Sequence, residues 1–101
     1  MEYNTCDVER CLYLISYILT SIDKGVFESE DKGWKEDIKI SLYVLQKKTR
    51  RLSDKSAARH ISQCIHHWNE PFLKPETEEE KWEKIKEEIK DRLTIVLRYI
   101  S

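Results

Sequence analysis

Glycine, proline and cysteine are all scarce in this sequence. The 101 residues include two glycines, two prolines and three cysteines, and no CxxC pair occurs. Sheet proteins need many turns rich in glycine and proline, so this composition argues against a β-fold. The odd number of cysteines and their spacing argue against a disulfide framework. We therefore expect reduced thiols, as in a cytosolic protein.

Long hydrophobic runs and a strong net charge are also missing. The longest apolar run, from Cys11 to Ile22, spans 12 residues and contains Ser16, Thr20 and Ser21. A helix that spans a bilayer needs about 20 apolar residues, so we expect no membrane segment. Acidic residues near the start argue against a signal peptide. The net charge of -1 predicts no overall attraction to nucleic acid or to membranes.

The common signatures of catalysis are absent too. The sequence has no glycine-rich phosphate loop, no GxSxG, no HExxH and no EF-hand loop. Its many acidic residues alternate with lysines near the C-terminus, as on a solvated helix face. We therefore expect neither an enzyme nor a protein with a cofactor.

The sequence does contain apolar residues at helical spacing. Four stretches, at about 5–24, 32–52, 54–68 and 77–100, place apolar side chains every three or four residues. The prediction is a single domain over residues 1–101, an all-α antiparallel four-helix bundle with up-down topology and short loops. The predicted core positions are Val8, Cys11, Leu12, Ile15, Ile18, Leu19 and Ile22, then Trp34, Ile38, Ser41, Leu42, Leu45 and Leu52, then Ala57, Ala58, Ile61, Cys64, Ile65 and Trp68, and finally Trp82, Ile85, Ile89, Leu93, Val96 and Ile100.

Residues that start and stop helices separate the four stretches. Asn4 or Thr5 suits the N-cap of the first helix, and Ser53 suits that of the third. Thr77 opens a capping box just before the fourth helix. Gly25 supplies the left-handed residue that ends many helices, so we place the end of the first helix there.

Several large apolar side chains fall outside the core positions. A second apolar side on the helix at 32–52 predicts either two neighbours within the chain or a contact with another subunit, such as a homodimer. Tyrosine is enriched at the energetic centres of protein interfaces, so we also interpret these residues as a partner-binding surface. The candidate partner-binding residues are Tyr17, Ile40, Tyr43, Val44 and Tyr99.

Charge is unevenly distributed along the chain. The segment 47–60 has six Lys or Arg and one Asp, and the segment 76–91 has eight acidic residues and four lysines. The two segments either lie side by side and cancel, or serve as separate partner surfaces. Nucleic-acid phosphates or an acidic protein are the counterparts that the basic segment suits. Its candidate contact residues are Lys47, Lys48, Arg50, Arg51, Lys55 and Arg59.

Arg59 and His66 are separated by six residues, which places both on one side of the predicted third helix and away from its apolar face. An Arg and a His at this kind of spacing on a helix resemble the catalytic pair of HEPN-type ribonucleases, a family of small helical bundles that often act as dimers. The resemblance covers residues 59–66 alone. It implies an alternative function in which His66 moves protons and Arg59 holds an RNA phosphodiester.

His60, Cys64 and His67 fall on one side of the same predicted helix. Thiolate and imidazole groups suit Zn²⁺, and Cys6 or Cys11 is the candidate fourth ligand. Cys64 also fits the apolar stripe, where a free cysteine behaves as a small apolar residue. We favour this second interpretation, and the metal site stays an alternative.

Together these features favour a small cytosolic protein-binding module of the inhibitor, immunity, antitoxin or accessory-subunit type. We expect it to act by steric occlusion of a partner protein, with off-stripe aromatic residues as anchors and the charged segments steering the encounter. The alternative is an RNA-contacting helical module that uses the basic segment and Arg59 with His66.

Overall fold

The computed structural model describes residues 5–30, 33–52, 55–70 and 77–100, with side chains from residue 7 onward. These residues form four α-helices and one 3₁₀-helix, and they contain no strand. In chain order the elements are α1 (Thr5–Asp23), η1 (Val26–Glu28), α2 (Trp34–Arg50), α3 (Ser56–Asn69) and α4 (Glu78–Ile100).

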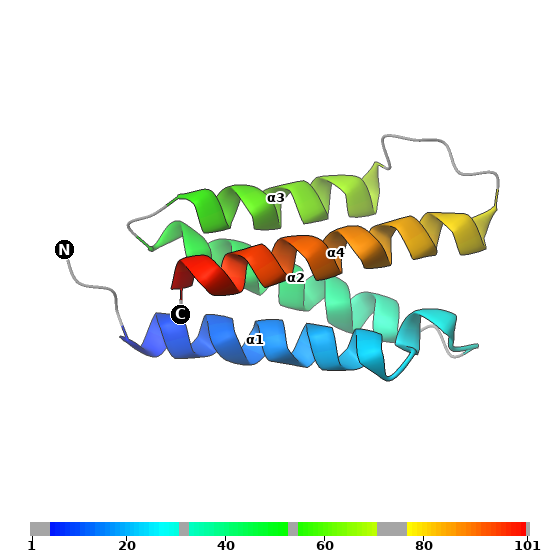
Figure 1. Ribbon diagram of the computed structural model, residues 1–101, viewed down its shortest axis with the longest axis horizontal. Helices are drawn as coiled ribbons and strands as arrows, with labels where there is room; N and C mark the ends of the chain where they lie inside the picture. Colours follow the sequence, from blue (N-terminus) through cyan, green and yellow to red (C-terminus); the bar gives the residue numbers. More distant parts are fainter. Residues whose placement is uncertain (1–4, 31–32, 53–54, 71–76, 101) are drawn as a thin grey trace.

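Consecutive α-helices run in opposite directions (Figure 1). Helix α1 packs against α2 and α4, and α3 also packs against α2 and α4, so each helix has two neighbours. Helices α2 and α4 therefore occupy opposite corners of the bundle, whose extents are 46 × 25 × 19 Å. The predicted all-α bundle with up-down topology is confirmed. Within the described ranges, no helix combines the length and hydrophobicity that crossing a bilayer requires.

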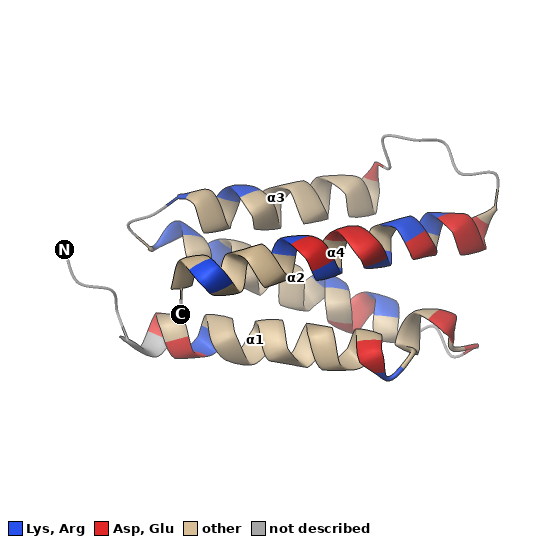
Figure 2. Ribbon diagram, in the orientation of Figure 1, with Lys and Arg blue, Asp and Glu red and all other residues tan. Residues whose placement is uncertain are grey.

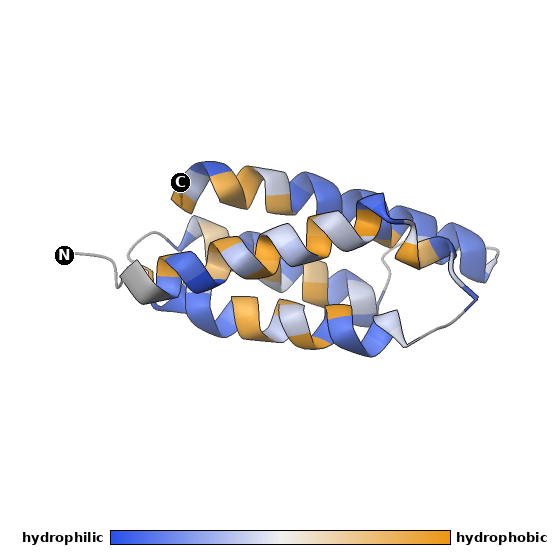
Figure 3. Ribbon diagram, turned by 90° about the horizontal axis from the view of Figure 1, so that it is seen from below, coloured by the Kyte–Doolittle hydropathy of each residue, from blue (hydrophilic) through white to orange (hydrophobic). Residues whose placement is uncertain are grey.

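The predicted apolar stripes form the core. Figure 3 shows hydrophobic and hydrophilic bands alternating along the helices, as expected of amphipathic elements. Every predicted core position from Trp34 to Trp68 is buried. Four predicted positions on α1 and α4 are half-buried and pack against the core: Val8, Leu12, Leu19 and Trp82.

The connection between α1 and α2 is more structured than the expected short loop. Gly25 adopts a φ of 79°, which ends α1 in the predicted way, and its amide donates to the Ile22 carbonyl at 3.0 Å. Helix η1 follows at once and buries Phe27 against the core. A three-residue helix has no periodicity for a sequence pattern to reveal, so this core residue was missed.

Helix α2 is shorter at both ends than the predicted 32–52, although Leu52 stays buried beyond its last turn. Helix α3 begins at Ser56 rather than near Asp54. The predicted caps Asn4 and Ser53 lie outside the described residues, and so does the side chain of Thr5.

The start of α4 carries its predicted cap. The backbone amide of Glu80 donates to Thr77 Oγ1 at 3.1 Å, which satisfies one of the free amides of the first turn. Three glutamates follow in that first turn, where negative charge is favoured by the helix dipole. The Thr77 cap and the acidic first turn therefore set where α4 begins.

Aromatic rings fill one end of the core. The ring centroids of Phe27 and Trp34 lie 4.4 Å apart, and those of Trp68 and Trp82 lie 5.0 Å apart. Trp34 and Trp82 meet nearly edge to face at 5.4 Å, an arrangement that aromatic rings prefer. The predicted packing of the three tryptophans is confirmed, and Phe27 joins them from η1.

Candidate interaction surface

Exposed apolar side chains are concentrated on one side of the bundle. Large hydrophobic residues that the described structure leaves exposed lie mainly on α1 and α2, with a single member on α4. The exposed fractions reach 67% for Tyr13 and 53% for Ile40. We call the α1–α2 members the α1–α2 face; they are Tyr13, Tyr17, Ile40, Tyr43 and Val44.

The helix geometry brings Tyr17 and Ile40 to the same level. The ion pair between Lys48 Nζ and Asp7 Oδ1, at 3.2 Å, fixes the register of α1 against α2. At a rise of about 1.5 Å per residue, Tyr17 lies about 15 Å along α1 from Asp7, and Ile40 lies about 12 Å back along α2 from Lys48. The two antiparallel helices therefore present these side chains at neighbouring heights.

Tyr43 lies on the α3 side of the α1–α2 face. Its hydroxyl accepts a hydrogen bond from Asn69 Nδ2 of α3 at 3.3 Å, while 41% of the residue stays exposed. The ring is thus held in place by its polar end and leaves its apolar body accessible. Such an amphipathic, positioned tyrosine is typical of interface anchors.

Tyr99, the remaining predicted partner-binding residue, lies elsewhere. Its ring stacks on His60 of α3, with centroids 6.2 Å apart and planes at 29°. Since α3 and α4 form the side of the bundle opposite α1 and α2, Tyr99 does not join the α1–α2 face. Its α4 neighbour Ile95 is half-buried. The five predicted partner-binding residues therefore divide into four on one side and one on the other.

The α3–α4 seam carries a chain of polar contacts. His67 Nδ1 lies 2.7 Å and 2.5 Å from the two carboxylate oxygens of Glu88. Arg92 Nε donates to Glu88 Oε2 at 3.2 Å, and Arg92 Nη1 donates to His60 Nδ1 at 3.0 Å. We call this chain the His67–His60 network. It ties α3, from its second turn to its last, to the middle of α4.

Burial is the main cause of a lowered pKa at His60, and the nearby Arg92 cation adds to it. The geometry agrees, because an imidazole that accepts a hydrogen bond from a guanidinium at Nδ1 is in its neutral form. The network is therefore complete when His60 carries no charge.

The candidate metal ligands His60, Cys64 and His67 are engaged in other contacts. The imidazoles belong to the His67–His60 network, and the Cys64 side chain is buried in the core. Burial, with a smaller effect of Glu88, raises the pKa of the Cys64 thiol to about 12. Burial and Asp7 raise the pKa of Cys11 to about 11. In the part of the chain that is described, no three His, Cys, Asp or Glu residues are grouped to hold a metal ion, so this alternative gains no support.

The basic segment is partly used within the fold. Asp7 of α1 pairs with Lys48 at 3.2 Å and with Arg51 at 3.6 Å. The Lys55 ammonium donates to the backbone carbonyls of Arg50 and Leu52. Asp7 is thus an acidic counterpart of the basic segment, and no ion pair between the described residues joins this segment to the segment 76–91. Figure 2 shows the acidic first half of α4 toward the other end of the bundle.

Three of the predicted cations keep accessible charges. The side chains of Lys47, Arg50 and Arg59 are exposed and form no ion pair with another described residue. His66 is also exposed on α3, and its ring centroid lies 5.3 Å from that of His67. Arg59 and His66 therefore share the outer side of α3, as the spacing predicted. About 10 Å of helix separates them.

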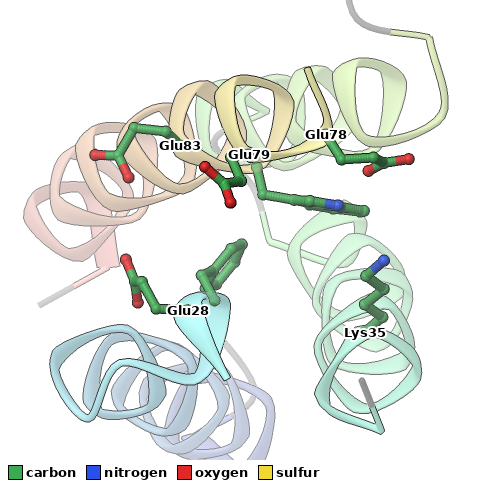
Figure 4. A pocket seen from close by; sticks show the side chains of 7 residues that line it. Glu28, Lys35, Glu78, Glu79 and Glu83 are labelled. Carbon is green, nitrogen blue, oxygen red and sulfur yellow. The ribbon is translucent and has the colours of Figure 1, made fainter. Parts of the chain in front are cut away.

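A cavity that sequence reasoning missed opens between η1 and the first turns of α2 and α4 (Figure 4). Its volume is about 490 Å³, and it is lined by aromatic side chains, acidic side chains and one lysine: Phe27, Glu28, Lys35, Glu78, Glu79, Trp82 and Glu83. Such a lining suits a cation, because carboxylates and aromatic faces both attract positive charge. No spacing in the sequence marks this cavity, since it depends on how η1 folds against α4.

The cations of this cavity come from the chain itself. Lys35 Nζ lies 4.6 Å from the centroid of the Trp82 ring. Lys86 Nζ pairs with Glu28 at 2.7 Å and with Glu83 at 2.9 Å. The hydrogen bond to Lys86 lowers the pKa of Glu28, and the two carboxylates raise the pKa of Lys86. The chain's own lysines thus already contact the aromatic and acidic groups that would attract a cation to this cavity.

Comparisons of the chain with family models, with curated proteins and with solved structures gave no match. The function must therefore be inferred from the residues and their arrangement.

Proposed function

We propose that this protein is a small protein-binding module that acts by steric occlusion of a partner protein, as inhibitors, immunity proteins, antitoxins and accessory subunits do. The contact is made by the α1–α2 face. Tyr17, Ile40, Tyr43 and Val44 are its anchors, and Tyr13 extends it along α1.

The exposure of these side chains is the single observation that carries the proposal. The core is filled without them, because each α-helix buries its own apolar stripe between its two neighbours. Scattered exposed apolar residues are normal, but adjacent ones on two packed helices mark interaction sites. Tyrosines add affinity at low entropic cost because their rings have few rotatable bonds.

The distribution of charge supports an electrostatically steered encounter. Exposed Lys47, Arg50 and Arg59 lie toward one end of the bundle, and the acidic first turns of α2 and α4 lie toward the other. A molecule with this polarity is oriented by a partner of complementary polarity before contact. Rim charges of this kind mainly raise the association rate.

Affinity capture with matched variants tests the proposal. The protein is immobilised as wild type, as the variant Tyr17→Ser with Ile40→Ser and Val44→Ser, and as the variant Tyr99→Ser. We expect the triple variant to lose its specific partner, and Tyr99→Ser to retain it, because Tyr99 lies across the bundle. Equal recovery of every captured protein by the triple variant and the wild type would remove the α1–α2 face as the contact.

The accessible cations favour RNA contact as a second candidate function. The exposed side chains of Lys47, Arg50 and Arg59 support it, and Arg59 with His66 would supply the chemistry if RNA is cleaved. Binding through phosphates must weaken steeply as salt rises. A salt titration with labelled RNA checks the contact, and the variant His66→Ala checks cleavage. Salt-independent binding, or cleavage that His66→Ala leaves undiminished, would exclude this candidate.

A further inference from the structure

A line of exposed residues with regular spacing runs along the outer side of α2. Glu36, Ile40, Tyr43, Lys47 and Arg50 are exposed and follow one another at intervals of four, three, four and three residues. At about 100° per residue they fall within roughly 80° of the helix circumference. Alternation of three and four residues is the pattern by which one helix packs lengthwise against another. All five stay exposed although α1 and α3 both pack against α2, and Asn69 of α3 donates a hydrogen bond to the Tyr43 hydroxyl.

This line of residues is complementary to the same line on a second copy of the chain that lies antiparallel. The apolar pair Ile40 and Tyr43 and the charged pair Glu36 and Lys47 have the same midpoint, between residues 41 and 42. A twofold axis at that point sets Ile40 against Tyr43 of the second copy, and Glu36 against Lys47 of the second copy. Each contact occurs twice, as an isologous interface requires.

Charge on the rest of the molecule favours the same occupant. Glu36 and Lys47 form no ion pair with another described residue, so both charges are available. In the antiparallel arrangement, the acidic end of one bundle lies beside the basic end of the other. A parallel arrangement would instead bring Glu36 toward Glu36 of the second copy, which is repulsive.

We propose that the outer side of α2 binds the same side of a second copy of this chain, antiparallel, with an apolar centre of Ile40 and Tyr43 and flanking ion pairs between Glu36 and Lys47. The inference rests on the proposed function, because Ile40 and Tyr43 of the α1–α2 face make this contact as well. The contact is reversible and its strength falls with added salt.

Charge reversal with a mixing control tests the dimer. Sedimentation equilibrium measures the dimer dissociation constant for the wild type, for Glu36→Lys, for Lys47→Glu, for the double variant, and for an equimolar mixture of the two single variants. Each single reversal creates two repulsive contacts, so we expect it to raise the dissociation constant about tenfold or more. The double variant and the mixture restore attraction at both contacts, so we expect values within about threefold of the wild type.

The controls separate a dimer defect from a folding defect. Glu87→Lys, an equal charge change on the exposed side of α4, leaves the dissociation constant unchanged, and circular dichroism checks that each variant is folded. A wild type that stays monomeric at every concentration overturns the proposal, and so does association that the single reversals leave unchanged or that the mixture does not restore. A monomeric protein that still loses a captured partner in the Tyr17, Ile40 and Val44 triple variant refutes the dimer and leaves the proposed function standing.

Discussion

The two sides of the bundle differ in how their outer side chains are satisfied. Across α3 and α4, the His67–His60 network links the helices through Glu88 and Arg92, and the Tyr99 ring stacks on His60. Across α1 and α2, five large hydrophobic side chains lie outside the core and are exposed among polar and charged ones. The contact between α3 and α4 is tied by the chain's own polar residues, whereas Ile40 and Val44 of the α1–α2 face are exposed.

The roles of these residues in the structure differ from the roles that the sequence suggests. The histidines of α3 stand out as candidates for catalysis or metal binding, yet two of the three serve the contact between α3 and α4. The less conspicuous residues Ile40 and Val44 have no comparable role in the fold. Residues that the fold does not explain are the better candidates for function.

The largest expected effect is a difference in unfolding free energy between substitutions on the buried side and on the exposed side of α2. Leu42 is 1% exposed, and Leu42→Ala removes buried methyl groups and leaves a cavity, which costs about 2–5 kcal/mol of unfolding free energy. Ile40→Ala, two residues away on the exposed side, changes the unfolding free energy by about 0.5 kcal/mol or less. Urea titrations of both variants give these values. Similar destabilisation by the two substitutions would show that the outer side of α2 is needed for folding.

The next effect concerns the α3–α4 seam. Glu88→Ala removes the acceptor that joins His67 to Arg92 and leaves both donors partly buried, so we expect a loss of about 1–3 kcal/mol. Glu87→Ala, on the exposed side of the same helix turn, is the matched control and costs about 0.5 kcal/mol or less. Equal stabilities of the two variants in urea would mean that the network does not hold the helices together.

A smaller effect depends on pH. The pKa of His60 is lowered in the fold, so the unfolded chain binds more protons in mildly acidic solution. The stability that this group contributes is present above its unfolded pKa of about 6.5 and is lost as pH falls from that value through the lower pKa of the folded state. Thermal melts between pH 7.5 and 5 should show a steeper loss for the wild type than for His60→Gln. An identical slope for both proteins would assign the acid sensitivity to other groups.

The fold was largely predictable from the sequence because helical periodicity repeats over many residues. The stripes through Ile38, Ile61 and Ile89 are buried as predicted, and Gly25 and Thr77 act as the predicted helix signals. Phe27 escaped prediction because a three-residue helix offers no repeat. Long elements are therefore predictable and short ones are not.

The candidate surface was predictable only in part. Exposure of Tyr17, Ile40 and Tyr43 follows from their positions off the apolar stripes. The separation of Tyr99 from them depends on which helices are neighbours, and a single sequence does not state this. The partnership of His67 with Glu88 depends in the same way on the register between α3 and α4.

A dilution series followed by amide chemical shifts tests most directly whether the outer side of α2 joins two copies of the chain. The predicted result is a set of concentration-dependent shifts centred on Ile40, Tyr43 and Lys47, with His60 and Arg92 unchanged. Shifts centred on the α3–α4 seam, or none at millimolar concentration, would contradict it.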